Sequence, residues 1–310
     1  MDPWMQRLSG VMPVLPTAFD PDGGVDRDAM RAFVGFAVAA GVDGLVFPGF
    51  ASEVETLTAE ERTELLQVVV DAAAGRVQIV AGASAATVEE AARYGRQALD
   101  LGIAHLLLQP PKEIGSAATA VGDFLAAASA ALPGARIILQ NAPAPRGSDL
   151  TPRAIIEVVR RVQAVRYVKE ETLPAGPAIT AMLAERPEHL IGVIGGGGAR
   201  YILDEYERGA CGAMPALEIA DLHVVLDRHY RAGEMAAARE IYVRTLPLLV
   251  LQAVYRMRLT KHVLARRGLP CTSVVRAPTP ELDAMATADI DRCLDEIEDL
   301  RTCADARRRA

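Results

Sequence analysis

Short runs of aliphatic and β-branched residues alternate with longer amphipathic stretches from the start of the chain to about residue 216. The short runs suit buried strands, and the amphipathic stretches have the apolar spacing of helices that cover a sheet. Repeated strand–helix units of this kind build a parallel sheet. The expected strands lie at residues 11–15, 44–47, 77–81, 105–108, 136–139, 165–169, 190–194 and 212–214.

Eight strands in such a series predict an α/β fold of the (β/α)8 TIM-barrel type over residues 1–216, with the active site in this part. The strand pattern then ends, and Leu, Ala, Val, Glu and Arg recur at helical spacing to about residue 300. Residues 217–310 are therefore expected to form a C-terminal α-helical region. A Gly-Leu-Pro sequence at 268–270 predicts a break within it.

Capping residues mark several of the expected helix starts. Thr58 stands three residues before Glu61, and Thr87 stands three residues before Glu90, which is the spacing of a capping box. Thr151 is followed by a proline, and proline is tolerated in the first turn of a helix. Three helices are therefore expected to begin at these threonines.

Composition and charge narrow the classes of function. The net charge of −7 and the pI near 5.4 disfavour binding to nucleic acid. No apolar run approaches the roughly 20 residues of a membrane span, and the N-terminus has no signal-peptide pattern. The four cysteines form no CxxC pair and have no histidine at zinc-ligand spacing, so no metal site is expected. These features predict a cytoplasmic protein that acts on a small molecule.

Lys169 is the first candidate for chemistry, because barrel enzymes carry their functional side chains at the C-terminal ends of strands. Alternation along its strand places Lys169 and Glu171 on the same face as Val165 and Tyr167. Burying an ammonium group is costly unless it is paired or neutral, and a Schiff-base lysine must attack as the free amine. The pattern leaves two interpretations open: a catalytic lysine, or a lysine paired with Glu170 or Glu171 at an exposed strand end.

Further motifs carry a family resemblance. They lie at residues 10–20, 42–46, 49–53, 57–62, 168–170 and 209–214. In order and at matching spacing, these segments resemble the dihydrodipicolinate synthase and N-acetylneuraminate lyase superfamily over nearly the whole chain. The resemblance implies a barrel with a C-terminal helical region, a Schiff base at Lys169, a 2-keto acid substrate such as pyruvate, no cofactor, and a homotetramer.

Several polar groups that are usual in this superfamily are replaced here. Gln140 stands at the position of the catalytic tyrosine, and an amide cannot relay a proton as a phenol does. Phe50 and Ala51 replace two threonines of the carboxylate-binding loop, so backbone N–H groups and Ser52 are the expected carboxylate donors. The usual arginine is displaced to Arg146. These changes argue against dihydrodipicolinate synthase activity itself.

Residues 140–144 (Gln-Asn-Ala-Pro-Ala) and 169–172 (Lys-Glu-Glu-Thr) are similar to the L-2-keto-3-deoxyarabonate dehydratase branch of the superfamily. The resemblance implies that Lys169 condenses with the 2-keto group and that water is then lost from C4. Glu171 is the expected general acid and base, and Gln140 is expected to orient the keto acid or a water molecule. A charge partner for Lys169 and a solvated carboxylate are the other interpretations of Glu171.

The expected substrate-binding residues come from three further loops. They are Ala51 and Ser52 in the carboxylate-binding loop, Gly196 and Gly197 in the glycine run after the seventh strand, and Met214 after the eighth. In the superfamily, the turn that corresponds to the glycine run lines the pocket near the lysine.

Three functions stay open on this basis. The first is a carbon–oxygen lyase, a dehydratase of a 2-keto-3-deoxy sugar acid. The second is a carbon–carbon lyase, an aldolase or synthase that uses the same Lys169. The third is a barrel that binds a keto acid without turning it over, which the missing polar groups would allow.

Overall fold

The computed structural model describes residues 7–303 and contains the expected alternation of strands and helices. The chain divides into two compact units. One consists of the N-terminal segment up to Ser9 together with Gln78–Met214, and the other consists of Gly10–Val77 and the chain from Pro215 onward.

The strands form one eight-stranded sheet in sequence order, and helices separate them along the chain, which confirms the predicted (β/α)8 barrel class. Their bounds are β1 Gly10–Val11, β2 Gly44–Phe47, β3 Gln78–Gly82, β4 His105–Leu108, β5 Arg136–Asn141, β6 Val165–Glu170, β7 Gly192–Gly195 and β8 Gly212–Ala213.

Strand β1 is shorter than the expected run at 11–15. Beyond Val11, Val14 makes only isolated parallel bridges, to Val46 and Ala216. Pro13 and Pro16 flank this bridge, and a proline has no N–H to donate to a strand ladder. The prolines therefore explain why a buried extended segment is not a continuous strand.

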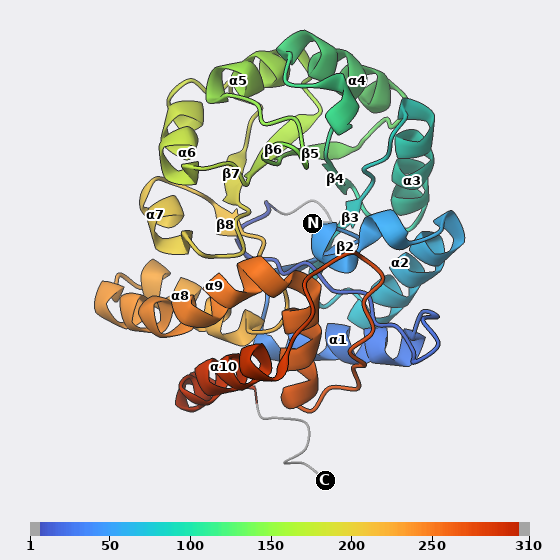
Figure 1. The fold of residues 1–310 in the computed structure, drawn as a ribbon. Coiled ribbons are helices and arrows are strands. Elements are labelled where there is room, and N and C mark those ends of the chain that lie inside the picture. Colours follow the sequence, from blue (N-terminus) through green and yellow to red (C-terminus); the bar gives the residue numbers. More distant parts are fainter. Residues whose placement is uncertain (1–6, 304–310) are drawn as a thin grey trace. The chain divides into compact units, whose positions relative to one another are not determined.

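In the first unit, strands β3 to β8 pair in parallel, and helices lie on their outer side in Figure 1. These helices are α3 Val88–Asp100, α4 Ala118–Ala130, α5 Pro152–Arg161, α6 Ala175–Ala184 and α7 Ile202–Glu207. Leu139 and Val168 belong to the apolar cluster that the strands form with these helices. Because side chains alternate along a strand, the neighbouring Gln140 and Lys169 point to the opposite face.

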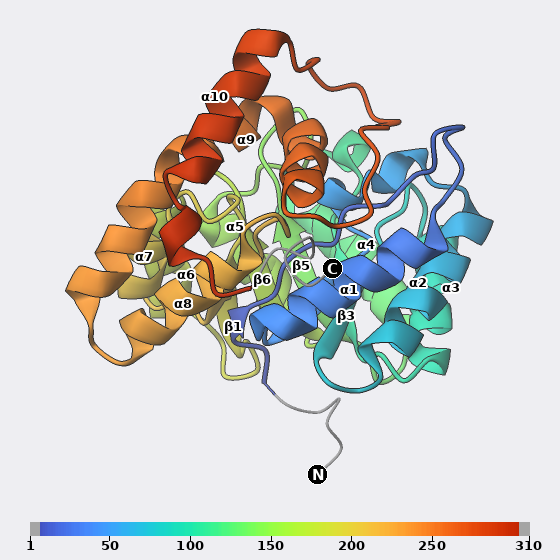
Figure 2. The ribbon, with the colours of Figure 1, turned by 90° about the horizontal axis from the view of Figure 1, so that it is seen from below.

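The second unit contains the helices α1 Arg27–Ala40, α2 Ala59–Ala73, α8 Ala220–Arg231, α9 Met235–Arg266 and α10 Ala284–Asp295. Helix α9 is interrupted at Arg256, whose φ of 49° is non-helical. Figure 2 shows α10 beside α9, in agreement with the contacts between the two helices. The described chain after residue 217 thus contains the expected C-terminal helices, with a non-helical stretch at residues 269–283, and α9 ends just before the Gly-Leu-Pro break.

The helix starts follow the expected caps. Thr58 and Glu61 form a reciprocal capping box at α2, and the Thr87 hydroxyl accepts the Glu90 N–H at α3. Thr151 caps α5, with a proline in the first turn. Within residues 7–303, no helix combines the length and the apolar character needed to cross a membrane.

Candidate active site

Lys169 lies at the C-terminal end of β6 and is buried, with 3% of the residue exposed. Its Nζ is 2.8 Å from Oε1 of Glu171. Both side chains leave the same face of the extended chain, as the period-two pattern predicted. The lysine is therefore paired with Glu171 as in the second interpretation above, but at a buried strand end and not at an exposed one.

Glu171 is bonded by three side chains. Oε1 accepts a hydrogen bond of 2.7 Å from Nε2 of Gln140 in addition to the Lys169 contact, and Oε2 is bonded by the guanidinium of Arg146. Burial by itself would raise the pKa of Glu171, but the charges and hydrogen bonds of Lys169 and Arg146 outweigh it and lower that pKa. Glu171 is therefore a carboxylate in this arrangement.

Gln140 reaches Glu171 because strands β5 and β6 pair in a register that places Gln140 beside Lys169. Gln140 is buried, and its side-chain amide connects the end of β5 to Glu171, the residue after β6. A primary amide can donate and accept hydrogen bonds but has no accessible proton to release near neutral pH. This side chain can therefore hold and orient groups, and Glu171 is the titratable partner next to Lys169.

Glu170 lies on the other face of the same strand and has neutral partners. Its carboxylate accepts hydrogen bonds from the side-chain amide of Asn141 and from the backbone and hydroxyl of Thr172. Burial raises the pKa of Glu170, opposed by these hydrogen bonds. The Asn141 side chain also donates to the carbonyl of Leu150 and accepts the Leu150 N–H. These two bonds hold the C-terminal end of the loop that carries Arg146.

Gly196, the first residue after β7, lies against the side chains of Lys169 and Glu171. A Cβ at this position would come within 2.4 Å of Cγ of Glu171 and 3.1 Å of Cε of Lys169. Its N–H donates to the carbonyl of Glu170 at 2.8 Å. Only a glycine allows the backbone to approach this closely. At Gly197 a Cβ would make an ordinary contact, 3.5 Å from Tyr201.

Met214 is buried directly after β8, and its N–H donates to the carbonyl of Gly195 at 2.9 Å. This bond continues the pairing of β7 with β8. Met214 is therefore tied to the residue that precedes Gly196.

A further buried carboxyl, on helix α7, was not expected from the sequence. Glu205 is 1% exposed, and neither of its oxygens has a hydrogen-bond partner in the described part of the chain. Burial, followed by the charges of Asp204 and Glu170, raises the pKa of Glu205 to about 7. Gly195 makes room for it, because a Cβ there would lie 1.9 Å from Oε2 of Glu205.

The predicted carboxylate-binding loop belongs to the other compact unit, where Phe50–Ser52 form a short 3-10 turn. The Ser52 hydroxyl donates to the carbonyl of Leu15 at 2.5 Å and accepts the Gly49 N–H at 2.9 Å. The Ser52 carbonyl in turn accepts the hydroxyl of Thr17. The hydroxyl hydrogen of Ser52 is thus donated to Leu15, and backbone N–H groups are the other donors that the sequence predicted for this loop.

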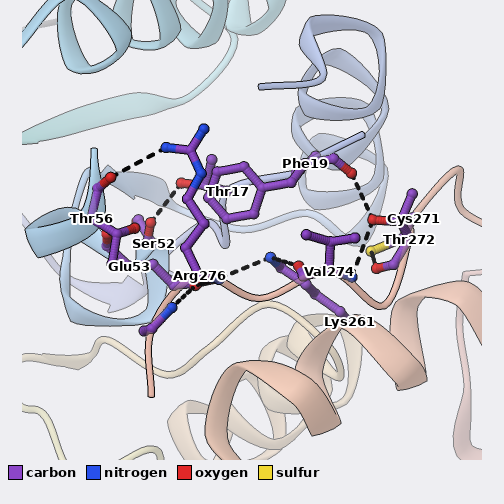
Figure 3. Close-up of polar contacts among 12 residues, drawn as sticks. Thr17, Phe19, Ser52, Glu53, Thr56, Lys261, Cys271, Thr272, Val274 and Arg276 are labelled. Atoms are coloured by element: carbon purple, nitrogen blue, oxygen red, sulfur yellow. Dashed lines mark hydrogen bonds and ion pairs between the residues drawn. The ribbon is translucent and has the colours of Figure 1, made fainter. Parts of the chain in front are cut away.

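Glu53 follows this loop in a left-handed conformation, with φ of 58°, and its side chain is fully buried. Figure 3 shows Glu53 with Lys261 and Arg276. Oε1 of Glu53 lies 2.8 Å from Nζ of Lys261. Its Oε2 accepts the backbone N–H groups of Arg276 and Ala277. Lys261 and Arg276 each lie 4.3 Å from the ring of Phe19. Charged groups from the C-terminal region therefore hold the end of the loop in place.

The structure brings together Lys169, Glu171, Gln140 and Gly196. Sequence reasoning noted Arg146 only as a displaced arginine and did not place it on Glu171. The proline before it and its position three residues after the Gln-Asn-Ala-Pro run were the available signals. Among residues 7–303, no group of three or more His, Cys, Asp or Glu side chains is arranged to hold a metal ion.

Known proteins resemble this chain over most of its length. A 4-hydroxy-tetrahydrodipicolinate synthase of Maridesulfovibrio salexigens is 30% identical over 78% of this chain and 82% of the relative. An L-2-keto-3-deoxyarabonate dehydratase of Azospirillum brasilense is 28% identical over 92% of this chain and 93% of the relative. The crystal structure of dihydrodipicolinate synthase from Rhodopseudomonas palustris matches with a TM-score of 0.86 and 25% identity. It covers 96% of this chain and 99% of that one.

The family itself follows from a match along almost the whole chain. The sequence profile of the dihydrodipicolinate synthetase family matches residues 7–297. This range includes β6 with Lys169, the loop that carries Arg146, and most of the C-terminal helices. The protein therefore belongs to the dihydrodipicolinate synthetase family.

Proposed function

We propose that this protein is a Schiff-base-forming lyase that removes water from a 2-keto-3-deoxy sugar acid. The observation that carries the proposal is the buried contact of Lys169 with Glu171, with Gln140 where the family usually has tyrosine. A carboxylate beside the amine can transfer a proton at the substrate carbon, whereas an amide in place of the phenol cannot.

In the first step, Lys169 attacks the 2-keto carbon and water leaves, so that an iminium forms. The attack needs a free amine, and Glu171 is close enough to accept the proton that the ammonium releases. Glu171 gives this proton to the former keto oxygen, which leaves as water, so that Glu171 is a carboxylate again when the iminium has formed. Gln140 holds the same oxygen of Glu171 and orients the carboxylate or the keto acid.

In the second step, the iminium makes the C3 hydrogen acidic. Glu171 takes this proton, the resulting enamine expels the C4 hydroxyl, and Glu171 returns the proton so that water leaves. The same carboxyl thus acts as base and then as acid, and the proton balance closes without another group. Hydrolysis of the imine releases the dehydrated acid and regenerates Lys169.

For the carboxylate of the keto acid, we propose the backbone N–H of Ala51 as the donor, while Ser52 shapes the loop through its bonds to Leu15 and Gly49. Gly196 keeps the space beside Lys169 open. Gly197 and Met214 remain proposed contacts of the substrate. By analogy with the family, we propose a cytoplasmic homotetramer.

A carbon–carbon lyase or synthase is the second candidate, favoured by the similarity to a 4-hydroxy-tetrahydrodipicolinate synthase. It would use the same Schiff base at Lys169. The two candidates differ in the product, because carbon–carbon cleavage releases pyruvate whereas dehydration leaves the carbon chain intact.

The test begins with pyruvate and sodium borohydride, which reduces an imine to a stable amine. We expect a mass increase on the intact protein that maps to the peptide containing Lys169, and no increase in Lys169→Ala. L-2-keto-3-deoxyarabonate is then supplied as substrate, and the products are separated by mass spectrometry.

Failure to form an adduct, or an adduct that persists in Lys169→Ala, would refute the Schiff base. Release of pyruvate from the deoxy acid would identify the carbon–carbon lyase. An adduct without turnover of any deoxy acid in a panel of chain lengths and stereoisomers would support the keto-acid-binding barrel.

A further inference from the structure

Two cations bond the proposed catalytic carboxylate of Glu171, and Arg146 is the more exposed of them. Its guanidinium bonds Oε2 of Glu171, and a quarter of its side chain remains exposed, whereas the Glu171 side chain is 7% exposed. Lys169 and Gln140 occupy the other oxygen, Oε1. The two carboxylate oxygens therefore have different partners.

The loop of residues 142–150 holds Arg146 at this place from several sides. The Arg146 N–H donates to the carbonyl of Pro143, and the Arg146 carbonyl accepts the side-chain amide of Gln109 at 2.9 Å. At the end of the loop, the N–H and the carbonyl of Leu150 both form hydrogen bonds with the side chain of Asn141. The Asn141 amide also donates to the carboxylate of Glu170. The loop backbone is therefore held by Gln109, directly after β4, and by Asn141 of β5, which is itself bonded to Glu170 of β6.

We propose that Arg146 is a positioning residue for the elimination, which holds Oε2 of Glu171 so that Oε1 faces Lys169 and the carboxylate stays charged. This inference rests on the proposed function, because it concerns the proton transfers of Glu171. Arg146 itself gives up no proton, since a guanidinium stays protonated in proteins.

The charges around Glu171 explain why a second cation matters. Lys169 on β6 and Arg146 on the β5–α5 loop are the cations that bond it. Glu170 on β6 and Glu205 on α7 are buried acids that interact with it electrostatically. From β5, Gln140 adds a neutral donor. After Lys169 has become part of the iminium and Glu171 is a carboxylate again, Arg146 is the cation that still bonds Oε2 and compensates this buried charge.

Arg146 also affects the second proton transfer. A nearby cation lowers the pKa of a carboxyl group, and the protonated carboxyl becomes a stronger acid. Glu171, after it has taken the C3 proton, therefore returns that proton more readily to the departing C4 hydroxyl. Without Arg146, burial would favour the neutral acid and slow both the uptake and the return.

The test measures exchange of the C3 hydrogens of pyruvate with deuterium by proton NMR across pH. This exchange needs the Schiff base and its base but does not depend on the identity of the sugar acid. In Arg146→Met, we expect the acidic limb of the rate profile to move up by about one pH unit or more. The rate relative to the unmodified protein then falls about tenfold on the acidic limb, where the pH lies below both pKa values, and the two rates become equal on the plateau at higher pH.

Two variants complete the experiment. Arg146→Lys keeps the positive charge and is expected to restore most of the profile. Arg93→Met removes an exposed arginine of α3, paired with Glu90 at 4.0 Å, and should leave the profile unchanged. The borohydride adduct with pyruvate is measured in parallel, because it reports on Lys169 alone.

A profile of Arg146→Met that is lowered equally at every pH, or unchanged, would overturn the positioning role. Absence of the pyruvate adduct in the unmodified protein would instead refute the proposed function. A lost adduct in Arg146→Met, not restored in Arg146→Lys, would also count against the inference, because it indicates disruption of the loop.

Discussion

Two adjacent glutamates show how strongly the surroundings of a single residue decide its chemistry. Glu170 and Glu171 are neighbours in sequence, yet their pKa values are shifted in opposite directions. Glu171 is bonded by two cations, whereas Glu170 has the neutral partners Asn141 and Thr172. Alternation along β6 sends the two side chains to different faces, and this separates the proposed catalytic carboxylate, Glu171, from Glu170.

Glu205 allows a prediction about stability and pH. Its pKa is raised to about 7 in the folded protein, so the folded state binds the proton more tightly than the unfolded state. The resulting stabilisation is complete below the ordinary pKa of 4.5 and is lost as pH rises through about 7. The loss amounts to about 3 kcal/mol.

We therefore expect Glu205→Gln to unfold at a higher temperature than the unmodified protein near pH 8, and at a similar temperature near pH 5. Thermal unfolding followed by circular dichroism at both pH values measures this. Glu207→Gln, an exposed change on the same helix, is the control. A difference in melting temperature that is the same at both pH values would contradict the expected linkage.

At the scale of elements, the turn after β7 determines how closely the backbone approaches β6. Gly196 is bonded to the carbonyl of Glu170 and faces Glu171 and Lys169. A run of four glycines in the sequence predicts a flexible or tight turn but does not distinguish between its members. The pairing of β6 with β7 assigns the close approach to Gly196 and not to Gly197.

Gly196→Ala should therefore lower the rate of pyruvate hydrogen exchange by about a hundredfold, because the new methyl group displaces Glu171 or Lys169. Gly197→Ala is the matched control and should stay within about threefold of the unmodified protein, since its methyl group makes an ordinary contact. Circular dichroism verifies that both variants are folded. An equal loss of exchange rate in the two variants would contradict this prediction, because it would show that any substitution in the turn lowers the rate and that the close approach of Gly196 is not the cause.

At the scale of the whole molecule, the C-terminal region completes the environment of a loop near the start of the chain. Lys261 and Glu53 are 208 residues apart in sequence and form an ion pair with both side chains fully buried. Burial lowers the pKa of Lys261, opposed by the charge and the hydrogen bond of Glu53. Neither residue alone suggests this pairing, because each is polar within a helical or loop pattern.

Removing one partner of a buried pair leaves an uncompensated charge, which costs about 3–5 kcal/mol. Lys261→Met should therefore lower the free energy of unfolding by about this amount in urea denaturation. Arg292→Met, which breaks an exposed pair with Asp289, should cost less than about 1 kcal/mol. The double change Glu53→Gln with Lys261→Met should be less destabilising than Lys261→Met alone, and the opposite order would contradict the assignment.

The sequence by itself determined the barrel class, the places of the eight strands and the face that Lys169 shares with Glu171. These features follow from local periodicity, capping residues and alternation along a strand, each of which acts over a few residues. The positions of Gln140 and Gly196 were also identifiable as candidates, because they follow strand ends.

Only the tertiary structure decided which groups bond to one another. The register of β5 on β6 places Gln140 beside Glu171, and the loop of residues 142–150 places Arg146 beside the same carboxylate. The packing of α7 buries Glu205 without a hydrogen-bond partner in the described part of the chain. Hydrogen bonds between elements, and the desolvation that shifts a pKa, depend on distances in space. A one-dimensional pattern specifies which face a side chain takes, but not what it meets there.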